Sequence, residues 1–268
     1  INTSTFTKLY DFTGGTQSGA LPSGSLYLAT DNNLYGSTSY YGANNSGVLF
    51  KFNPSNSNYT DLYHFDGNAN GGVPTGSLLE YSNGLVYGTT SDGGYGDGII
   101  FSFNFTNSIF TNVHNFNSYM DGSVPYGDLS LAPDGKMYGM TAFGGDNGVG
   151  IIFKYDPQNT TNPFTKVFSF NSATTGANPS GSLLEATNGL LYGITCNGGQ
   201  NSMGTLFKFN TSNSNFTKIL DFDNTKGGSA SGSLIQASDG MIYGLTSAGG
   251  TSNFGVIFQY NPNNDAYN

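Results

Sequence analysis

Residues 187–199 read TNGLLYGITCNGG, and close variants of this stretch occur five times in the chain. Each variant places a tyrosine between an apolar residue and a glycine. The five tyrosines are Tyr35, Tyr87, Tyr138, Tyr192 and Tyr243. Their separations are 52, 51, 54 and 51 residues. A fixed period of this length is the signature of a repeat architecture, so five copies of one unit are predicted.

Each copy has the pattern of four short antiparallel strands. A Gly-Ser-Leu sequence opens the first strand, and Asn-Gly or Asp-Gly, a pair typical of a type I′ hairpin, ends it in four copies. The Tyr-Gly stretch forms the second strand, and a glycine-rich loop leads to the third, which residues 47–52 exemplify. Residues 216–222 exemplify the fourth strand. The repeats start near Gly24, Gly76, Gly127, Gly181 and Gly232.

The sequence predicts complementary strands at the two ends of the chain. The last copy is expected to stop after its third strand, whereas residues 6–12 (Phe-Thr-Lys-Leu-Tyr-Asp-Phe) read as an unpaired fourth strand. Ring closure of this kind characterises a β-propeller, in which blades surround a channel and no long edge stays open. We therefore expect one all-β domain over residues 1–268, a five-bladed propeller of four-stranded antiparallel blades. Residues 1–23 are expected to complete the last blade.

Composition limits the classes of partner. The chain is 36% hydrophobic with 40 glycines and has no apolar run of membrane-spanning length, so no membrane insertion is expected. Only 9% of residues are charged, the net charge is -9, and all eight basic residues are lysines. A nucleic-acid surface needs clustered cations, so this partner is not expected. The lone cysteine, Cys196, takes a position where other copies have serine or alanine and is interpreted as a small packed residue.

The motifs resemble the GloVer tandem repeat of secreted or surface-anchored bacterial proteins. The pattern Pro-x-Gly-x-Leu, Leu-Tyr-Gly-x-Thr, Gly-Gly and Gly-x-x-Phe-Lys matches nearly the whole chain, with departures at Tyr41-Gly42 and at Ala230. The resemblance implies a surface setting. The start at Ile1, without a methionine or signal-type segment, further suggests a processed or excised piece. We expect an extracellular or cell-surface location.

A ligand is most readily placed on the loops that link the second and third strands. In an up-and-down blade these loops share one end with the connections between blades, and long loops on a rigid scaffold commonly carry binding residues. Aromatic rings there suit sugar C–H faces, while amides and carboxylates suit hydroxyls, and repetition adds avidity. The candidate ligand-binding residues are Tyr40, Tyr41, Asp92, Tyr95, Asp97, Phe143, Asp146, Asn197, Gln200 and Asn253.

The leading hypothesis is a multivalent carbohydrate-binding or adhesive module whose partner is a glycan or cell-surface polymer. The alternative reading is that these residues are ordinary loop residues of a structural module that contacts neighbouring surface proteins. The absence of tryptophan favours that alternative. The five tyrosines are interpreted as architectural residues between blades, with a tyrosine ring lining the channel as the other possibility.

Enzyme signals are weak, so no enzyme is expected, with a glycoside hydrolase or lyase as the third reading. Glu80 and Glu185 occupy the same place in copies two and four and could form the carboxylate pair of a glycosidase. Asp128 replaces the serine of the other copies and is the best lone acidic candidate. No metal site and no cofactor are predicted. Asp92 and Asp97 on one glycine loop leave calcium as a minor possibility.

Overall fold

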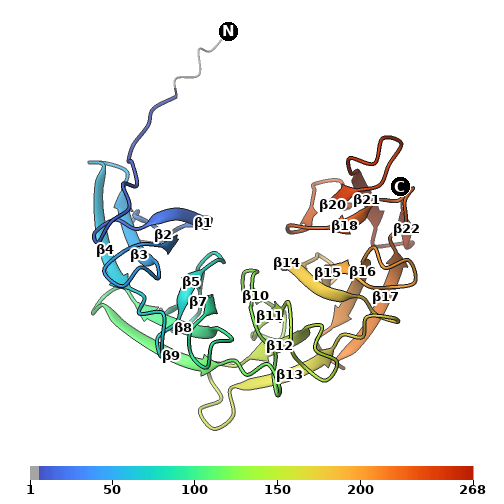
Figure 1. Cartoon of the computed structure of the whole chain (residues 1–268), viewed down its shortest axis with the longest axis horizontal. Coiled ribbons are helices and arrows are strands. Elements are labelled where there is room, and N and C mark those ends of the chain that lie inside the picture. The colour runs from blue at the N-terminus through green and yellow to red at the C-terminus, as the bar shows by residue number, and fades with distance from the viewer. Residues whose placement is uncertain (1–5, 268) are drawn as a thin grey trace.

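The computed structural model describes residues 6–267, which contain β-strands and loops but no helix, and therefore no helix able to cross a membrane. The strands form five antiparallel sheets. The sheets stand side by side in an open arc, with the first strand of each sheet on the inner side and the last strand on the outer rim (Figure 1). We call the sheets blades, first to fifth in chain order. The predicted all-β architecture of repeated four-stranded units is confirmed.

The strand boundaries follow the repeats. The first blade comprises β1 (Ala20–Leu28), β2 (Leu34–Tyr40), β3 (Val48–Asn53) and β4 (Asn58–His64). The second comprises β5 (Gly72–Pro74), β6 (Leu79–Glu80), β7 (Val86–Asp92), β8 (Ile99–Asn104) and β9 (Ile109–Asn115). The third comprises β10 (Ser130–Leu131), β11 (Met137–Thr141), β12 (Ile151–Tyr155) and β13 (Phe164–Ser169). The fourth comprises β14 (Ala177–Glu185), β15 (Leu191–Asn197), β16 (Thr205–Asn210) and β17 (Asn215–Asp221). The fifth comprises β18 (Gly228–Ala230), β19 (Ile235–Gln236), β20 (Ile242–Ala248), β21 (Ile257–Asn261) and β22 (Ala266–Tyr267).

The hairpin before each Tyr-Gly strand is not the predicted type I′ turn. In the second blade the N–H of Gly84 donates to the Tyr81 carbonyl at 2.9 Å, and Gly84, but not Asn83, has a positive φ. This geometry is a type I turn followed by a left-handed glycine, the second common hairpin solution. The Asn83 side chain explains the choice, because its Oδ1 accepts the N–H of Leu85 at 3.0 Å and its amide donates to the Tyr87 hydroxyl at 2.9 Å.

A hydrogen bond between a turn side chain and the tyrosine hydroxyl occurs in every copy. The tyrosine hydroxyl donates to an aspartate in three copies and accepts from an asparagine in two. The residue pairs are Tyr35–Asp31, Tyr87–Asn83, Tyr138–Asp134, Tyr192–Asn188 and Tyr243–Asp239. The first four rings are buried, and Tyr243 in the fifth blade is half-buried. The architectural interpretation of the tyrosines is therefore supported.

The glycine after each tyrosine leaves space for a phenylalanine of the third strand. A Cβ at Gly36 would lie 2.8 Å from the Phe50 ring, and one at Gly88 would lie 2.6 Å from the Phe101 ring. The other three glycines stand even closer to the matching rings. Such distances are far below van der Waals contact, so only glycine fits at this position of the second strand. The packing therefore depends on both residues of the Tyr-Gly pair.

The core lies between blades rather than within any one of them. Four clusters of buried side chains each join residues of two neighbouring blades. In the third boundary, Tyr138 and Ile152 pack with Leu183 of the next blade. On the outer rim Phe168 stacks on Phe216 with ring centroids 4.0 Å apart. Each blade is thus stabilised by its neighbours, as expected of repeats that cannot bury their faces alone.

A row of hydrogen bonds also crosses the blade boundaries on the inner side of the arc. In each case a backbone N–H donates to the side chain of the corresponding residue in the next blade. The donor–acceptor pairs are Ser25–Ser77, Ser77–Asp128, Asp128–Ser182 and Ser182–Ser233. Glycine precedes each of these residues because the backbones meet there: a Cβ on Gly76 would lie 2.9 Å from the Gly127 carbonyl oxygen.

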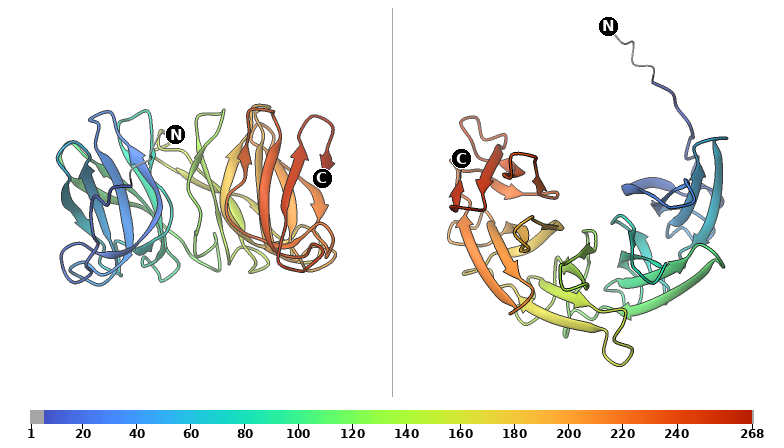
Figure 2. Two further views of the ribbon diagram at one scale, coloured as in Figure 1. Left: turned by 90° about the horizontal axis from the view of Figure 1, so that it is seen from above. Right: turned by 180° about the vertical axis from the view of Figure 1, so that it is seen from behind.

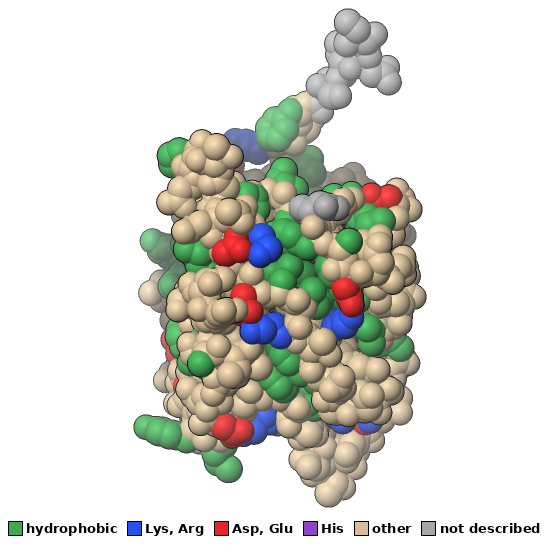
Figure 3. Space-filling model, turned by 90° about the vertical axis from the view of Figure 1, so that its right-hand side faces the viewer, with side chains coloured by type: hydrophobic (Ala, Val, Ile, Leu, Met, Phe, Trp, Pro, Cys, Tyr) green, Lys and Arg blue, Asp and Glu red, His purple; other side chains and the backbone are tan. Residues whose placement is uncertain are grey.

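Charged groups on the outer rim pair with each other. Seen from the side of the last blades, hydrophobic side chains form a band along the rim with lysine and acidic side chains beside it (Figure 3). Lys208 Nζ lies 3.0 Å from Asp265 Oδ1, and Lys218 Nζ lies 2.8 Å from Asp221 Oδ2. Ion pairs at a protein surface contribute little to stability, so the rim depends mainly on its packed rings.

The predicted ring closure is not seen. The first and fifth blades stand at opposite ends of the arc, and Figure 2 shows the open side between them. The fifth blade has an outer strand of its own, because Tyr267 of β22 pairs with Tyr260 of β21. The described part of the N-terminal segment contacts the first blade instead, where Phe12 packs edge to face on Phe50. Residues 1–5, which the prediction also assigned to the last blade, lie outside the described residues.

Candidate functional site

The loops between second and third strands gather at one end of the arc, together with the connections between blades, as antiparallel order requires. They include residues 41–47, 93–98, 142–150, 198–204 and 249–256. In three of these loops an asparagine, Asn44, Asn147 or Asn201, donates to the carbonyl of the residue that follows the outer strand of the same blade. Asn147 Nδ2 donates to the Phe170 carbonyl at 2.7 Å, and Asn201 Nδ2 donates to that of Phe222 at 2.9 Å. These amides hold the loops and are not free ligand groups.

Exposed aromatic side chains concentrate where the second blade meets the third. Tyr95 is 73% exposed, and Tyr119, on the connection between these blades, is 94% exposed. Met120, which follows Tyr119, and Phe143, on the loop of residues 142–150, are also exposed. The structure thus adds Tyr119 and Met120 to the predicted Tyr95 and Phe143. We call these four residues the aromatic patch.

Hydrogen bonds hold the three loops of the aromatic patch together. Asp97 Oδ2 accepts the N–H of Ser118 at 2.8 Å, and the Asp97 carbonyl accepts the N–H of Val124 at 2.8 Å. Phe143 and Ser123 exchange two backbone hydrogen bonds of 3.1 and 2.9 Å. Asp97 was predicted to contact a ligand, but in the structure it links the loops that carry the aromatic patch.

The other predicted acids of this face also have partners within the chain. Asp92 Oδ1 accepts the N–H of Gly93 at 2.7 Å. Asp146 forms an ion pair with Lys166, and hydrogen bonds from Lys166 and then Ser169 hold the pKa of Asp146 below its ordinary value. Within residues 6–267 no three His, Cys, Asp or Glu side chains gather as metal ligands.

The remaining candidates are distributed along the arc. Tyr40 and Tyr41 are exposed on the first blade, far along the chain from the aromatic patch. In the fourth blade Asn197 donates to Asn178 at 3.2 Å, and only the backbone of Gln200 is engaged, by Asp221 at 2.8 Å. In the fifth blade Asn253 caps its own loop through the N–H of Gly249 at 2.9 Å. The ten residues therefore form separate groups, one or more per blade, and not a single cavity.

The acidic candidates do not assemble into a catalytic pair. Glu80 on β6 accepts a hydrogen bond from the Tyr27 hydroxyl of the first blade, and Glu185 lies on β14 with the whole third blade between them. Burial and then this hydrogen bond raise the pKa of Tyr27 to about 12. Asp128 accepts the N–H of Ser77 at 2.5 Å and so fills the place of serine in the inner row of hydrogen bonds.

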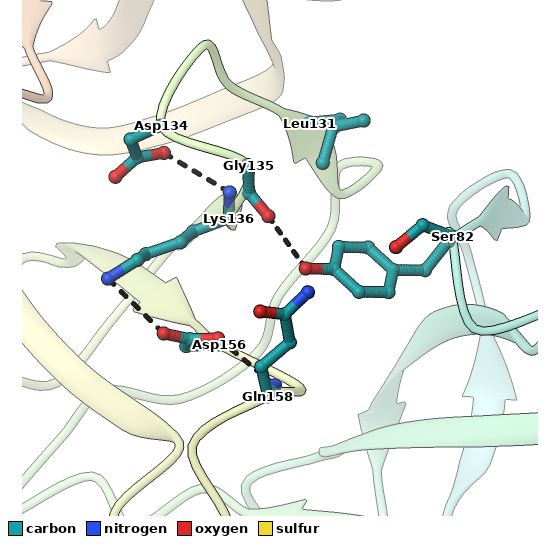
Figure 4. A pocket seen from close by; sticks show the side chains of 8 residues that line it. Ser82, Leu131, Asp134, Gly135, Lys136, Asp156 and Gln158 are labelled. Atoms are coloured by element: carbon teal, nitrogen blue, oxygen red, sulfur yellow. Dashed lines mark hydrogen bonds and ion pairs between the residues drawn. The ribbon is translucent and has the colours of Figure 1, made fainter.

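A polar pocket of about 320 Å³ opens at the opposite end, between the second and third blades. Figure 4 shows Lys136 and Asp156 facing one another across it, with Nζ and Oδ2 3.2 Å apart. The Tyr81 hydroxyl donates to the Gly135 carbonyl at 2.8 Å. Burial acts to raise the pKa of Asp156, but hydrogen bonds from the Gln158 N–H and Lys136 outweigh it and lower the pKa.

This pocket was not predicted from the sequence. Its one distinctive signal is a lysine in the hairpin at position 136, where the other copies have an uncharged residue. Those residues are Asn33, Leu85, Leu190 and Met241. Since the pocket's charges are already paired, the aromatic patch is the stronger candidate for a ligand site.

The family model described as the Gloeobacter/Verrucomicrobia repeat matches residues 1–131 and 93–268. No curated protein matches the sequence. Among solved structures, a candidate 6-phosphogluconolactonase from Bacteroides uniformis has a TM-score of 0.62 at 17% identity, covering 95% of this chain and 72% of its own. The extracellular domain of the candidate one-component system BT4673 from B. thetaiotaomicron also has a TM-score of 0.62, at 14% identity, covering 98% and 29%.

TolB from Acinetobacter baumannii has a TM-score of 0.53 at 13% identity, covering 88% of this chain and 50% of its own. The chain thus spans half the length of TolB and less than a third of the BT4673 domain. At these identities the likeness shows the fold alone, a tandem-repeat β-propeller type, and says nothing of activity.

Proposed function

The chain belongs to the Gloeobacter/Verrucomicrobia repeat family, and from that premise and the loop end of its blades we propose that it is an extracellular, multivalent carbohydrate-binding module. Its partner would be a glycan or cell-surface polymer, and its role adhesion. The observation that carries the proposal is the aromatic patch of Tyr95, Tyr119, Met120 and Phe143 on three interlocked loops.

The chemistry of the patch favours a sugar over other ligands. Exposed tyrosine rings present an apolar face and a hydroxyl, which match the C–H faces and hydroxyls of a pyranose. Among the described residues, Lys166 and Lys226 near this end are paired with Asp146 and Asp223, so an anionic polymer is disfavoured. Tyr40 and Tyr41 on the first blade and the exposed Phe254 on the fifth supply further contact points along the arc. Weak sites on one rigid scaffold bind a polymer tightly through effective concentration.

The extracellular location is supported by similarity to other proteins and not by a feature of the loops. One structural neighbour is an extracellular domain, and the sequence motifs resemble those of secreted and surface-anchored proteins. An enzymatic role has less support, because Glu80 and Glu185 lie on blades that do not adjoin. A purely structural module is the second candidate, favoured by exposed apolar side chains on the first and fifth blades, such as Leu26 and Ile257.

A glycan array tests the proposal with labelled protein, in calcium and in chelator. The variant Tyr95→Ala with Tyr119→Ala should weaken binding about tenfold or more, equivalent to about 1.4 kcal/mol. Both rings are exposed, so the melting temperature should not change. Ile109→Ala is the matched control, because Ile109 is an exposed apolar residue at the start of β9, at the opposite end of the blade.

Three results decide between the candidates. Loss of binding in the double variant with normal binding of Ile109→Ala supports the proposal. A folded wild-type protein that binds nothing on the array contradicts it and favours the structural module. Binding that survives the double variant contradicts the placement of the site on the aromatic patch.

A further inference from the structure

The exposed face of the fifth blade is half of the interface that joins the blades elsewhere. Ile257 is 78% exposed, although the residues at the same place in the other four blades have no exposure at all. Those residues are Leu49, Ile100, Ile152 and Leu206. Leu245 is 58% exposed, whereas its counterpart Ile194 in the fourth blade is 2% exposed. A shallow pocket lined by Tyr243, Leu245 and Ile257 marks this surface, which we call the tail face.

The first blade presents the other half. Leu26 is 55% exposed, whereas its counterparts are at most 7% exposed. They are Leu78, Leu129, Leu183 and Leu234. Leu26 lines an apolar pocket of about 150 Å³ with Leu34, Phe50 and Phe52, which face the preceding blade in the repeat pattern. We call this surface the head face.

Within residues 6–267, backbone hydrogen bonds between neighbouring blades also leave one donor on the first blade and one acceptor on the fifth without a partner of this kind. At each boundary within the arc, the N–H of a residue with positive φ donates to a loop carbonyl of the preceding blade. The pairs are Val73–Ser46, Val124–Asp97, Asn178–Val149 and Ser229–Met203, all between 2.8 and 3.0 Å. The fifth such pair would join Leu21, which has the same positive φ, to Phe254. Leu21 is 63% and Phe254 89% exposed.

The N-terminal segment behaves as an outer strand that belongs to no blade. Tyr10 stacks on Tyr59 with centroids 4.2 Å and planes 6° apart, as Phe168 of β13 stacks on Phe216 of β17 at 4.0 Å and 4°. Lys8 and Asp11 form an ion pair of 2.8 Å, as Lys218 and Asp221 do in β17. Residues 6–12 therefore occupy the position of the last strand of a preceding blade, but they pair with no sheet.

Within the described residues, β22 pairs with β21 only at Tyr260 and Asn261, whereas β17 pairs with β16 at six positions. In the fourth blade Thr217 pairs with Lys208 and Leu220 with Leu206. The same register would place Thr7 opposite Gln259 and Tyr10 opposite Ile257, continuing from the point where β22 ends.

We propose that the chain associates head to tail with a second copy of itself, and that residues 7–12 of one copy pair with β21 of the other. This strand addition extends the pairing of β21 beyond Tyr260, while the head face of the second copy covers Leu245 and Ile257 on the tail face. Gly14, Gly15 and Gly19, all with positive φ, lie between the segment and β1 and allow the strand to change direction. The two contacting surfaces differ, so the assembly closes as a ring or continues as a filament.

A second copy fits these observations better than closure within one chain. Joining the first and fifth blades of one arc would shift all four packed boundaries together. Their buried rings leave little freedom, because packed interiors do not deform continuously.

Disulfide trapping tests the pairing directly. Thr7→Cys with Gln259→Cys, in the background Cys196→Ser, places two thiols opposite each other only if the strand pairs as proposed. Serine is natural at position 196, since Ser39, Ser91 and Ser247 occupy the same place. Mild oxidation should give dimers and larger species on a non-reducing gel. The matched control is Thr7→Cys with Lys208→Cys, because Thr217 already occupies the place opposite Lys208 and no dimers should form.

Light scattering on the unmodified chain, from about 1 to 100 μM, should show a mass that rises with concentration. Leu245→Asp with Ile257→Asp should keep the chain monomeric and folded, because both side chains are exposed in a single copy. Ile109→Asp, an equally exposed control, should leave association unchanged. A monomer throughout this range contradicts the proposal. A Thr7–Gln259 disulfide formed within one chain also overturns it, in favour of closure within the arc.

Discussion

The N–H of Ser77 in the second blade donates a hydrogen bond of 2.5 Å to Oδ1 of Asp128 in the third. Asp128 in turn donates its own N–H to Ser182 Oγ at 2.9 Å. The carboxylate that stood out in the sequence as the lone replacement for serine therefore performs the task of that serine. It links two blades on the inner side of the arc.

Removing this side chain should cost stability, and serine should restore it. Asp128→Ala leaves the Ser77 N–H without its acceptor, and we expect the free energy of unfolding to fall by about 1–2 kcal/mol. Asp128→Ser should recover most of this, since Ser182 and Ser233 accept the same bond at the next boundaries. Urea unfolding of the three proteins measures the difference. Equal stability of the alanine and serine variants would show that the bond contributes nothing.

A second prediction concerns the glycine of the Tyr-Gly pair. A Cβ on Gly139 of β11 would overlap the ring of Phe153 on β12. Gly139→Ala should therefore lower the free energy of unfolding by about 2–3 kcal/mol through overpacking. Adding Phe153→Leu should relieve the clash, so that the double variant loses about 1–2 kcal/mol less than the sum of the single changes. Strict additivity in urea unfolding would contradict the steric explanation.

The repeated sequence predicts the arrangement of the blades but not the type of turn before each Tyr-Gly strand. The period of the Tyr-Gly stretch predicts the number and order of the blades, because each copy must use one geometry to pack on its neighbours. The predicted turn type was wrong because an asparagine or aspartate can either adopt a positive φ or form side-chain hydrogen bonds to the nearby backbone and to the tyrosine hydroxyl. In Asn83 and Asp134 the second use prevails.

The candidate site was harder to predict for a related reason. An asparagine in a loop is interpreted as a ligand group until its partner is known, and the side chain of Asn253 accepts the N–H of Gly249 in its own loop. Asp97 and Asp146 are likewise engaged by Ser118 and Lys166. The fourth strand of the last copy was missed because alanine replaces asparagine before Tyr267, although Asp265 keeps the positive φ found at Ser57 in the first blade.

The buried tyrosines predict a loss of stability at high pH. Burial and then the neighbouring Tyr87 raise the pKa of Tyr155 from 10.0 to about 12. A folded pKa above the unfolded value favours the folded state fully below about pH 10, and the advantage is lost as pH rises from about 10 to 12. Unfolding free energies measured across that window, with tyrosinate absorbance near 295 nm as a second signal, should decline.

Tyr155→Phe provides the control for this effect. The variant cannot ionise at this position, so its stability should decline less steeply with pH than that of the wild type, by one proton's contribution. Parallel slopes for the two proteins above about pH 10 would show that Tyr155 titrates normally in the folded state.

The last prediction tests whether the aromatic patch depends on the loops beneath it. The Asp97 carboxylate accepts the N–H of Ser118, the residue before Tyr119. Asp97→Ala should free this connection, so that the Ser118 amide exchanges hydrogen faster while the buried strand amides of β8 and β11 stay protected. If the patch binds glycan, affinity should fall by about three- to tenfold with little change in melting temperature, because ordering the loop then opposes binding. Asp92→Ala is the matched control, since the Asp92 carboxylate, within the described residues, accepts a hydrogen bond only from its own neighbour Gly93. Faster exchange at Ser118 with unchanged affinity would mean that a ligand does not use Tyr119, whereas unchanged exchange would mean that the Asp97 bond does not order the loop.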